Sequence, residues 1–137
     1  MHAAANTFAD SPHWTGLLGG RWVVGTSMHP PIGTATFRVV DGEHPVTAGL
    51  GDVEAWDERY CHLDVAASSR VLLATDHEGR EHPVVWASAG AARVVYDGLG
   101  HDARSYASPS RRALLHAELA WLLGERGATG AATGSAG

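Results

Sequence analysis

Short strand-like segments separated by tight turns constrain the fold of this chain more than any other feature. Segments rich in β-branched or aromatic residues, which favour strands, cover residues 34–40, 60–65, 71–75, 83–86 and 93–96. Turns such as Asp76-His77-Glu78-Gly79-Arg80 leave too little chain between them for crossover helices. Most neighbouring strands are therefore expected to pair antiparallel.

The beginning of the chain reads as the middle of a domain. Ser11 and Pro12 are typical of a helix cap and a first helical residue, and Gly19-Gly20 ends the helix predicted over residues 12–18. The small residues of segment 2–8 lead directly into this helix, as after a strand-to-helix turn. We therefore expect a strand to belong before Met1.

A second helix is predicted between Ser108, its cap, and Gly124. Its apolar stripe comprises Leu114, Leu115, Leu119, Trp121 and Leu122. The polar residues that fall largely off this stripe are Arg111, Arg112, His116 and Glu118. We expect these four side chains to face solvent.

The composition is that of one globular domain. Of 137 residues, 45% are hydrophobic and 18% are charged. The net charge is -5, and the sequence contains no lysine-rich block. Binding to nucleic acid is therefore not expected. No apolar run approaches the roughly 20 residues of a membrane helix, so no membrane contact is expected either. The single Cys61 fits a cytoplasmic location, to which a leader upstream of Met1 is the alternative.

Eight short motifs follow one another along most of the chain. They are His2-Ala3-Ala4, Leu18-Gly19-Gly20, His29-Pro30, His44-Pro45-Val46-Thr47-Ala48-Gly49-Leu50, Asp57-Glu58-Arg59-Tyr60, Pro83-Val84-Val85-Trp86, Ala92-Arg93-Val94-Val95-Tyr96 and Leu99-Gly100-His101. In their joint order and spacing the chain resembles the ThuA-like family, which is named for trehalose utilisation.

The resemblance implies a class I glutamine-amidotransferase-like fold, which is a flavodoxin-like three-layer α/β sandwich. Residues 1–124 are expected to form a partial ThuA-like domain, the C-terminal portion of that sandwich, with a partly parallel sheet and added antiparallel strands. Because family members carry further strands before the segment that matches Met1, the chain is expected to be truncated and to self-associate through an exposed sheet edge. Residues 125–137, built of small residues, are expected to form a flexible tail.

His101 is the strongest candidate for a catalytic side chain. It follows a predicted strand and the flexible Gly98 and Gly100, an arrangement that presents a side chain at the carboxyl edge of a sheet. The resemblance implies that His101 stands where the amidotransferase-like fold carries its triad histidine. A histidine that only fixes its loop by hydrogen bonds to backbone is the alternative.

His2 stands, by the same resemblance, at the elbow where class I amidotransferases carry a cysteine nucleophile. His2, Ala3 and Ala4 offer no sulfur or hydroxyl there. Cys61 lies far along the chain in a strand-like segment and is expected to be a buried thiol. Because thioester chemistry needs an activated nucleophile at the elbow, glutaminase activity is not expected.

Asp57 and Glu58 are adjacent carboxylates, which on an extended segment point to opposite sides. The resemblance favours Glu58 as the member that enters a pocket and Asp57 as the residue that holds a turn. A glutamate near imidazoles can act as a general base. Pro30 fixes the backbone of His29, which is a further candidate for the same pocket.

Trp86 and Tyr60 are expected to bind substrate. The ring of Trp86 would offer an apolar face to a sugar, and a place in the core is the alternative for this residue. The nine histidines show no spacing typical of a zinc site, so we expect no metal ion and no other cofactor.

These residues support functions of two classes. The first is a hydrolase- or lyase-type enzyme that performs acid/base chemistry on trehalose or a related sugar or keto-sugar. Its catalytic residues would be His2, His29, Glu58 and His101, which are expected to converge at the carboxyl edge of the sheet. The second is a non-catalytic sugar-binding or regulatory domain, with an inactive fragment as the remaining alternative.

Overall fold

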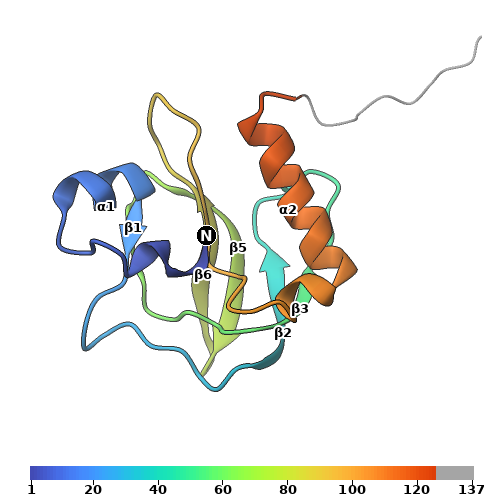
Figure 1. The fold of residues 1–137 in the computed structure, drawn as a ribbon, viewed down its shortest axis with the longest axis horizontal. Coiled ribbons are helices and arrows are strands. Elements are labelled where there is room, and N and C mark those ends of the chain that lie inside the picture. Colours follow the sequence, from blue (N-terminus) through green and yellow to red (C-terminus); the bar gives the residue numbers. More distant parts are fainter. Residues whose placement is uncertain (126–137) are drawn as a thin grey trace, which may run out of the picture.

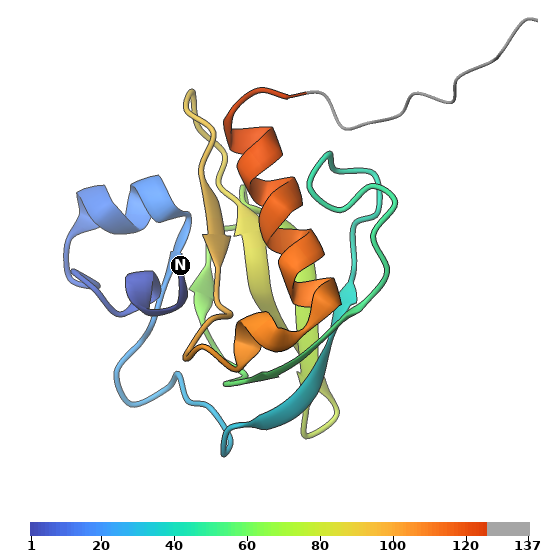
Figure 2. The ribbon, with the colours of Figure 1, turned by 45° about the vertical axis from the view of Figure 1, so that its right-hand side comes forward.

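A computed structural model describes residues 1–125 and shows an antiparallel sheet between two helical layers (Figures 1 and 2). The elements are η1 (His2–Ala5), α1 (Pro12–Leu18), β1 (Gly20–Arg21), β2 (Gly33–Val39), β3 (Val53–Asp57), β4 (Asp64–Val65), β5 (Arg70–His77), β6 (Arg80–Ala87), β7 (Val95–Asp97), η2 (Ser105–Ala107) and α2 (Pro109–Leu122). The predicted tail lies, beyond Glu125, outside the described residues.

The main sheet has the strand order β3-β2-β5-β6-β7, and β1 pairs with β4 separately. Every strand pair in residues 1–125 is antiparallel, so the partly parallel sheet that we expected is not found there. Because neighbours alternate in direction, β3, β5 and β7 run the same way. Their carboxyl ends therefore lie at one end of the sheet.

Local signals predicted several elements accurately. Helix α1 begins where predicted, with the Ser11 hydroxyl accepting a hydrogen bond from Trp14 N–H at 3.4 Å, and it ends at Gly19, whose φ is +75°. The turn between β5 and β6 is a two-residue hairpin in which Glu78 and Gly79 both have positive φ. Such turns match the twist of the strands that they join.

Strand β3 was missed from sequence although its side chains alternate. Val53, Ala55 and Asp57 are buried, and Glu54 and Trp56 are exposed. The strand escaped prediction because its inner face carries a small residue and a carboxylate, and its outer face carries a tryptophan. Asp57 and Glu58, which the sequence singled out, therefore lie at the end of an edge strand.

Two apolar clusters cover the two faces of the sheet. On one face, Leu114 and Trp121 of α2 pack against a cluster that includes Val85 and Leu72 (Figure 2). On the other face, Ala5 of η1 and Leu18 of α1 pack against a second cluster; its sheet residues are Trp86 and Tyr96. Within residues 1–125 no helix is long and apolar enough to cross a bilayer.

The face that α2 buries differs from the predicted apolar stripe. Arg111 and Glu118, expected in solvent, are 0% and 3% exposed, whereas Leu119 and Leu122 are 48% and 41% exposed. The physical reason is a buried ion pair, in which Arg111 Nη2 lies 2.5 Å from the Asp97 carboxylate at the end of β7.

The charges in this interior nearly cancel. Burial, and next the negative charge of Asp97, raises the pKa of Glu118 well above its ordinary value, so this carboxyl group favours its neutral form. Arg111 and Asp97 are then the charged groups of opposite sign that face each other. Such a pair is held in place because losing either partner leaves an uncompensated buried charge.

We expect Arg111→Ala to lower the free energy of unfolding by about 3–5 kcal/mol, because Asp97 would stay buried without its partner. Urea unfolding followed by circular dichroism measures this change. Arg112→Ala is the matched control, since Arg112 is exposed, and it should cost less than about 1 kcal/mol. Equal losses in both variants would contradict the role of the ion pair.

Two buried histidines accept backbone hydrogen bonds through Nδ1. Val46 N–H donates to His44 and His62 N–H donates to His82, both at 3.2 Å. Burial lowers the pKa of both imidazoles. Protonation of either Nδ1 would also remove its hydrogen bond, so the fold requires the neutral rings.

The protein should therefore lose stability as the pH falls below about 6.5, the ordinary histidine pKa. Below that pH the unfolded chain takes up protons on His44 and His82, whereas the folded chain, whose pKa values are lowered, takes them up only at lower pH. We expect the urea midpoint to drop less between pH 7.5 and pH 5 in a His44→Asn/His82→Asn variant, because Asn Oδ1 can replace the Nδ1 acceptor. The urea midpoint of a His13→Asn variant, changed at an exposed position, should drop as much as that of the parent.

Candidate functional site

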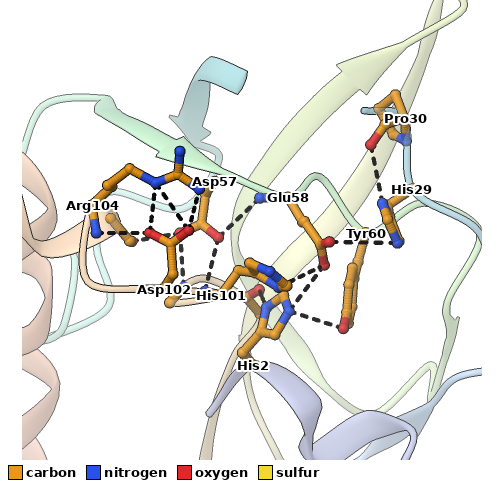
Figure 3. A network of polar contacts seen from close by, with 12 residues as sticks. His2, His29, Pro30, Asp57, Glu58, Tyr60, His101, Asp102 and Arg104 are labelled. Carbon is orange, nitrogen blue, oxygen red and sulfur yellow. Dashed lines mark hydrogen bonds and ion pairs between the residues drawn. The ribbon is translucent and has the colours of Figure 1, made fainter. Parts of the chain in front are cut away.

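Four separate segments bring titratable side chains to one place, which we call the His–Glu cluster: His2, His29, Glu58, Tyr60 and His101 (Figure 3). His2 begins η1, and His29 lies in the loop between β1 and β2. Glu58 directly follows β3, and His101 lies in the loop after β7. The structure thus gathers all four residues that we expected to converge.

Glu58 is the centre of the cluster. Its Oε2 atom lies 3.1 Å from His2 Nε2 and 3.2 Å from His101 Nδ1, and its Oε1 atom lies 3.6 Å from His29 Nε2. The side chains of Glu58 and His2 are 12% and 13% exposed, against 40% for His29 and 44% for His101. The cluster therefore has an inner pair and two outer imidazoles that solvent reaches.

Hydrogen bonds to backbone fix the orientation of the inner imidazole. His2 Nδ1 lies 2.7 Å from the Gly98 carbonyl, which can only accept, so Nδ1 carries a hydrogen. The backbone of η1 is held as well, because Tyr96 O–H donates to the His2 carbonyl and Trp14 Nε1–H donates to the Ala4 carbonyl, both at 3.0 Å. His2 Nε2 is consequently aimed at Glu58.

This arrangement calls for one additional positive charge. With Nδ1 protonated, a neutral His2 presents a lone pair at Nε2 to the lone pairs of the Glu58 carboxylate, 3.1 Å away. The contact becomes attractive when the imidazole or the carboxyl group gains a proton, or when a cation lies between them. Tyr60 O–H, 3.0 Å from the same Nε2, can donate to it in the neutral state.

Asp57 holds the loop that carries His101. Its carboxylate accepts hydrogen bonds from Gly100 N–H at 2.7 Å, from His101 N–H at 3.1 Å and from the Ser105 hydroxyl at 2.5 Å. It also accepts one from the N–H of Glu58 at 2.9 Å. The expectation that Asp57 holds a turn is confirmed, but the sequence did not show that the turn belongs to the opposite edge strand.

The two glycines before His101 are required by close contacts. A side chain at Gly98 would come within 2.7 Å of the Val84 carbonyl, and one at Gly100, whose φ is +103°, would collide with the Tyr106 hydroxyl. The chain therefore turns tightly after β7 and passes to the end of β3. This turn brings the loop after β7 into contact with the carboxyl end of β3.

The two aromatic residues that we expected to bind substrate differ in position. Tyr60 belongs to the cluster, where its ring lies 4.5 Å from the ring of His2, centre to centre, but it is only 5% exposed, so its ring is not open to a substrate as we expected. Trp86 is 0% exposed, stacks on Tyr96 and donates its indole N–H to the Leu18 carbonyl, so it offers no face to a sugar. The structure corrects the prediction for Trp86, whose apolar strand context fitted the core equally well.

Trp22 was missed and lies beside the cluster. Its ring centre is 4.9 Å from that of Tyr60 and 6.4 Å from that of His29, and it is partly exposed. Local sequence gave no signal for this placement, because Trp22 follows the glycine turn after α1 in an irregular segment. Cys61, by contrast, is 0% exposed, and burial raises the pKa of its thiol.

Comparison with known proteins agrees with the motifs. The family model for ThuA, trehalose utilisation, matches residues 1–122. The chain belongs to the ThuA family. Comparison with curated proteins gave no match.

Two solved ThuA-like proteins share the fold. A ThuA-like protein from Bacteroides uniformis superposes with a TM-score of 0.74 at 21% identity, over 91% of this chain and 57% of its own. One from Parabacteroides merdae gives a TM-score of 0.73 at 20% identity, over 98% of this chain and 61% of its own. The chain thus spans about three fifths of the length of these ThuA-like structures.

We expect Asp57→Ala to lower the free energy of unfolding by about 2–4 kcal/mol, because several buried donors would lose their charged acceptor. In the folded variant the His101 ring should give broadened or shifted NMR signals, while the signals of His13 stay unchanged. Asp10→Ala, at an exposed position, is the control for stability. A sharp, unshifted His101 signal in Asp57→Ala would contradict the positioning role.

Proposed function

We propose that this ThuA domain binds a small carbohydrate, trehalose or a related sugar or keto-sugar, at the His–Glu cluster and moves protons on it. The substrate class comes from the family, which is described by trehalose utilisation. The proton chemistry rests on one observation, the Glu58 carboxylate in contact with His2 and His101 and facing His29. Titratable groups brought together in this way are typical of catalytic sites.

In this proposal Glu58 is the general base and His101 the general acid. Glu58 is largely covered, accepts a proton from the substrate and shares it with His2, whose Nε2 lies 3.1 Å away. His101 is the most exposed of the imidazoles that face Glu58, so its ring can protonate a departing sugar oxygen. The reaction would then be an elimination; it would be a hydrolysis if Glu58 took the proton from a water molecule that attacks the sugar instead of from the sugar itself.

Covalent catalysis is not part of the proposal. Ala3 and Ala4, next to His2, carry no nucleophilic atom. The thiol of Cys61 is buried, and burial raises its pKa, which disfavours the reactive thiolate. These features support a ThuA domain that is not a glutaminase.

Aromatic rings line one side of the proposed carbohydrate site. Tyr60 stacks on His29 with ring centres 5.9 Å apart, and Trp22 packs edge-on against Tyr60. An exposed ring can offer an apolar face to the C–H groups of a sugar, and Trp22 is partly exposed. Tyr60 is only 5% exposed, so it supports the rings of His2, His29 and Trp22 rather than offering a face of its own. We assign sugar stacking to Trp22.

A non-catalytic sugar-binding or regulatory domain is the second candidate. The absence of a nucleophile next to His2 supports it, because a fold can persist after its chemistry has changed. For the fold, we propose that the described sheet belongs to the larger class I glutamine-amidotransferase-like sandwich. The additional length of the solved ThuA-like structures supports this, since parallel strands would lie in the part that this chain does not match.

Glu58→Gln and His101→Ala should each lower turnover of trehalose or keto-trehalose by about 10²–10⁴-fold, because each removes one proton-transfer group. Proton NMR of the sugar, incubated with the protein, measures the rate. Cys61→Ser changes a buried thiol that takes no part in the proposed proton transfers, and its turnover should stay within a few-fold of the parent. Sugar binding without turnover by the parent would favour the non-catalytic domain, and unchanged turnover in Glu58→Gln would refute the catalytic proposal.

A further inference from the structure

We propose that His2, Glu58 and His101 bind a divalent transition metal ion of the zinc class. The atoms that would bind it are His2 Nε2, Glu58 Oε2 and His101 Nδ1, which all lie within 4.8 Å of one another. Imidazole nitrogens with a carboxylate oxygen form a donor set that suits zinc and its neighbours in the first transition row.

The spacing of the donor atoms fits a metal centre. Zinc lies about 2.0–2.2 Å from nitrogen and oxygen ligands, so two ligands of a tetrahedral ion are roughly 3.3 Å apart. Glu58 Oε2 lies 3.1 Å from His2 Nε2 and 3.2 Å from His101 Nδ1. The donor pairs that involve Glu58 thus have nearly the separation that a shared ion requires.

The surroundings of His2 are those of a metal ligand. Metal-bound histidines usually donate the second ring N–H to a carbonyl or carboxylate, which fixes the ring and leaves the other nitrogen free. His2 Nδ1 donates to the Gly98 carbonyl at 2.7 Å, which leaves Nε2 as the free nitrogen. His29 repeats the pattern, since its Nδ1 lies 3.0 Å from the Pro30 carbonyl and its Nε2 faces Glu58 Oε1.

A bound cation would also supply the positive charge that the cluster lacks. With neutral imidazoles, the lone pair of His2 Nε2 opposes those of the Glu58 carboxylate. An ion between them turns this opposition into coordination. In the described part of the chain, no lysine or arginine forms an ion pair with Glu58; the ion pairs of this carboxylate are with His2, His29 and His101.

The proposed site would be open on one side. Structural zinc sites usually have four protein ligands, whereas catalytic sites have three and leave a position for water or substrate. Here three side chains, those of His2, Glu58 and His101, offer one donor atom each, and the side chain of His101 is 44% exposed. The structure therefore assigns the ion to an exchangeable, solvent-facing centre.

Zinc titration of the full chain, prepared without a histidine tag and stripped with a chelator, tests the inference. Competition with a chromophoric chelator should give one ion per chain, and Co²⁺ should give the visible absorption of a tetrahedral ion. His2→Gln, Glu58→Gln and His101→Gln should each weaken zinc binding by at least about 100-fold. His13→Gln and His116→Gln, at exposed positions, are the matched controls and should bind as the parent does.

Circular dichroism and urea unfolding identify any variant that fails to fold, and such a variant is replaced by the corresponding alanine substitution. Binding that is absent in the parent, or equally strong in the three cluster variants, would overturn the inference. Zinc binding does not rest on the proposed sugar chemistry. In the zinc-bound form Glu58 and His101 would be ligands, so the proton transfers proposed above belong to the metal-free cluster. Zinc bound without sugar turnover counts against the function alone, and turnover by a protein that binds no zinc counts against the metal alone.

Discussion

The His–Glu cluster depends on one buried carboxylate, that of Asp57, which accepts several hydrogen bonds. Asp57 ends β3, and its partners include Gly100 and His101 in the loop after β7. These strands are the two edges of the five-stranded sheet, so nothing in the sheet itself brings their ends together. Because Glu58 is the next residue, the same contact places the base of the proposed reaction beside His101.

The sequence carried the residues of the site but not their geometry. His2, His29, Glu58 and His101 stand at motif positions, and the glycines near His101 indicated a strand-end loop. Their spacing along the chain is not typical of a metal site. The donor atoms meet only in the folded protein, where the loop after β7 reaches the carboxyl end of β3. Trp22 was missed for the same reason, since its place beside Tyr60 depends on tertiary packing.

Two errors in the fold, the missed strand β3 and the misplaced face of α2, have a common physical cause, which is that polar residues occupy buried positions. Strand β3 presents Asp57 inward, and α2 presents Arg111 and Glu118 inward. A pattern that assigns apolar residues to the core misplaces such elements. Specific partners override the hydrophobic pattern here, most clearly in the Arg111–Asp97 pair. Self-association through a sheet edge stays a prediction.

The position of His2 on η1 connects the site to a local unfolding equilibrium. This four-residue 3-10 helix is held by hydrogen bonds, among them those from Tyr96 and Trp14, and by the packing of Ala5, and it contributes no strand to the five-stranded sheet. A chain with η1 open would still be folded but would lack one member of its cluster. A ligand that contacts His2 therefore binds only the chains in which η1 is closed, and its measured affinity is lowered by whatever fraction of chains has η1 open.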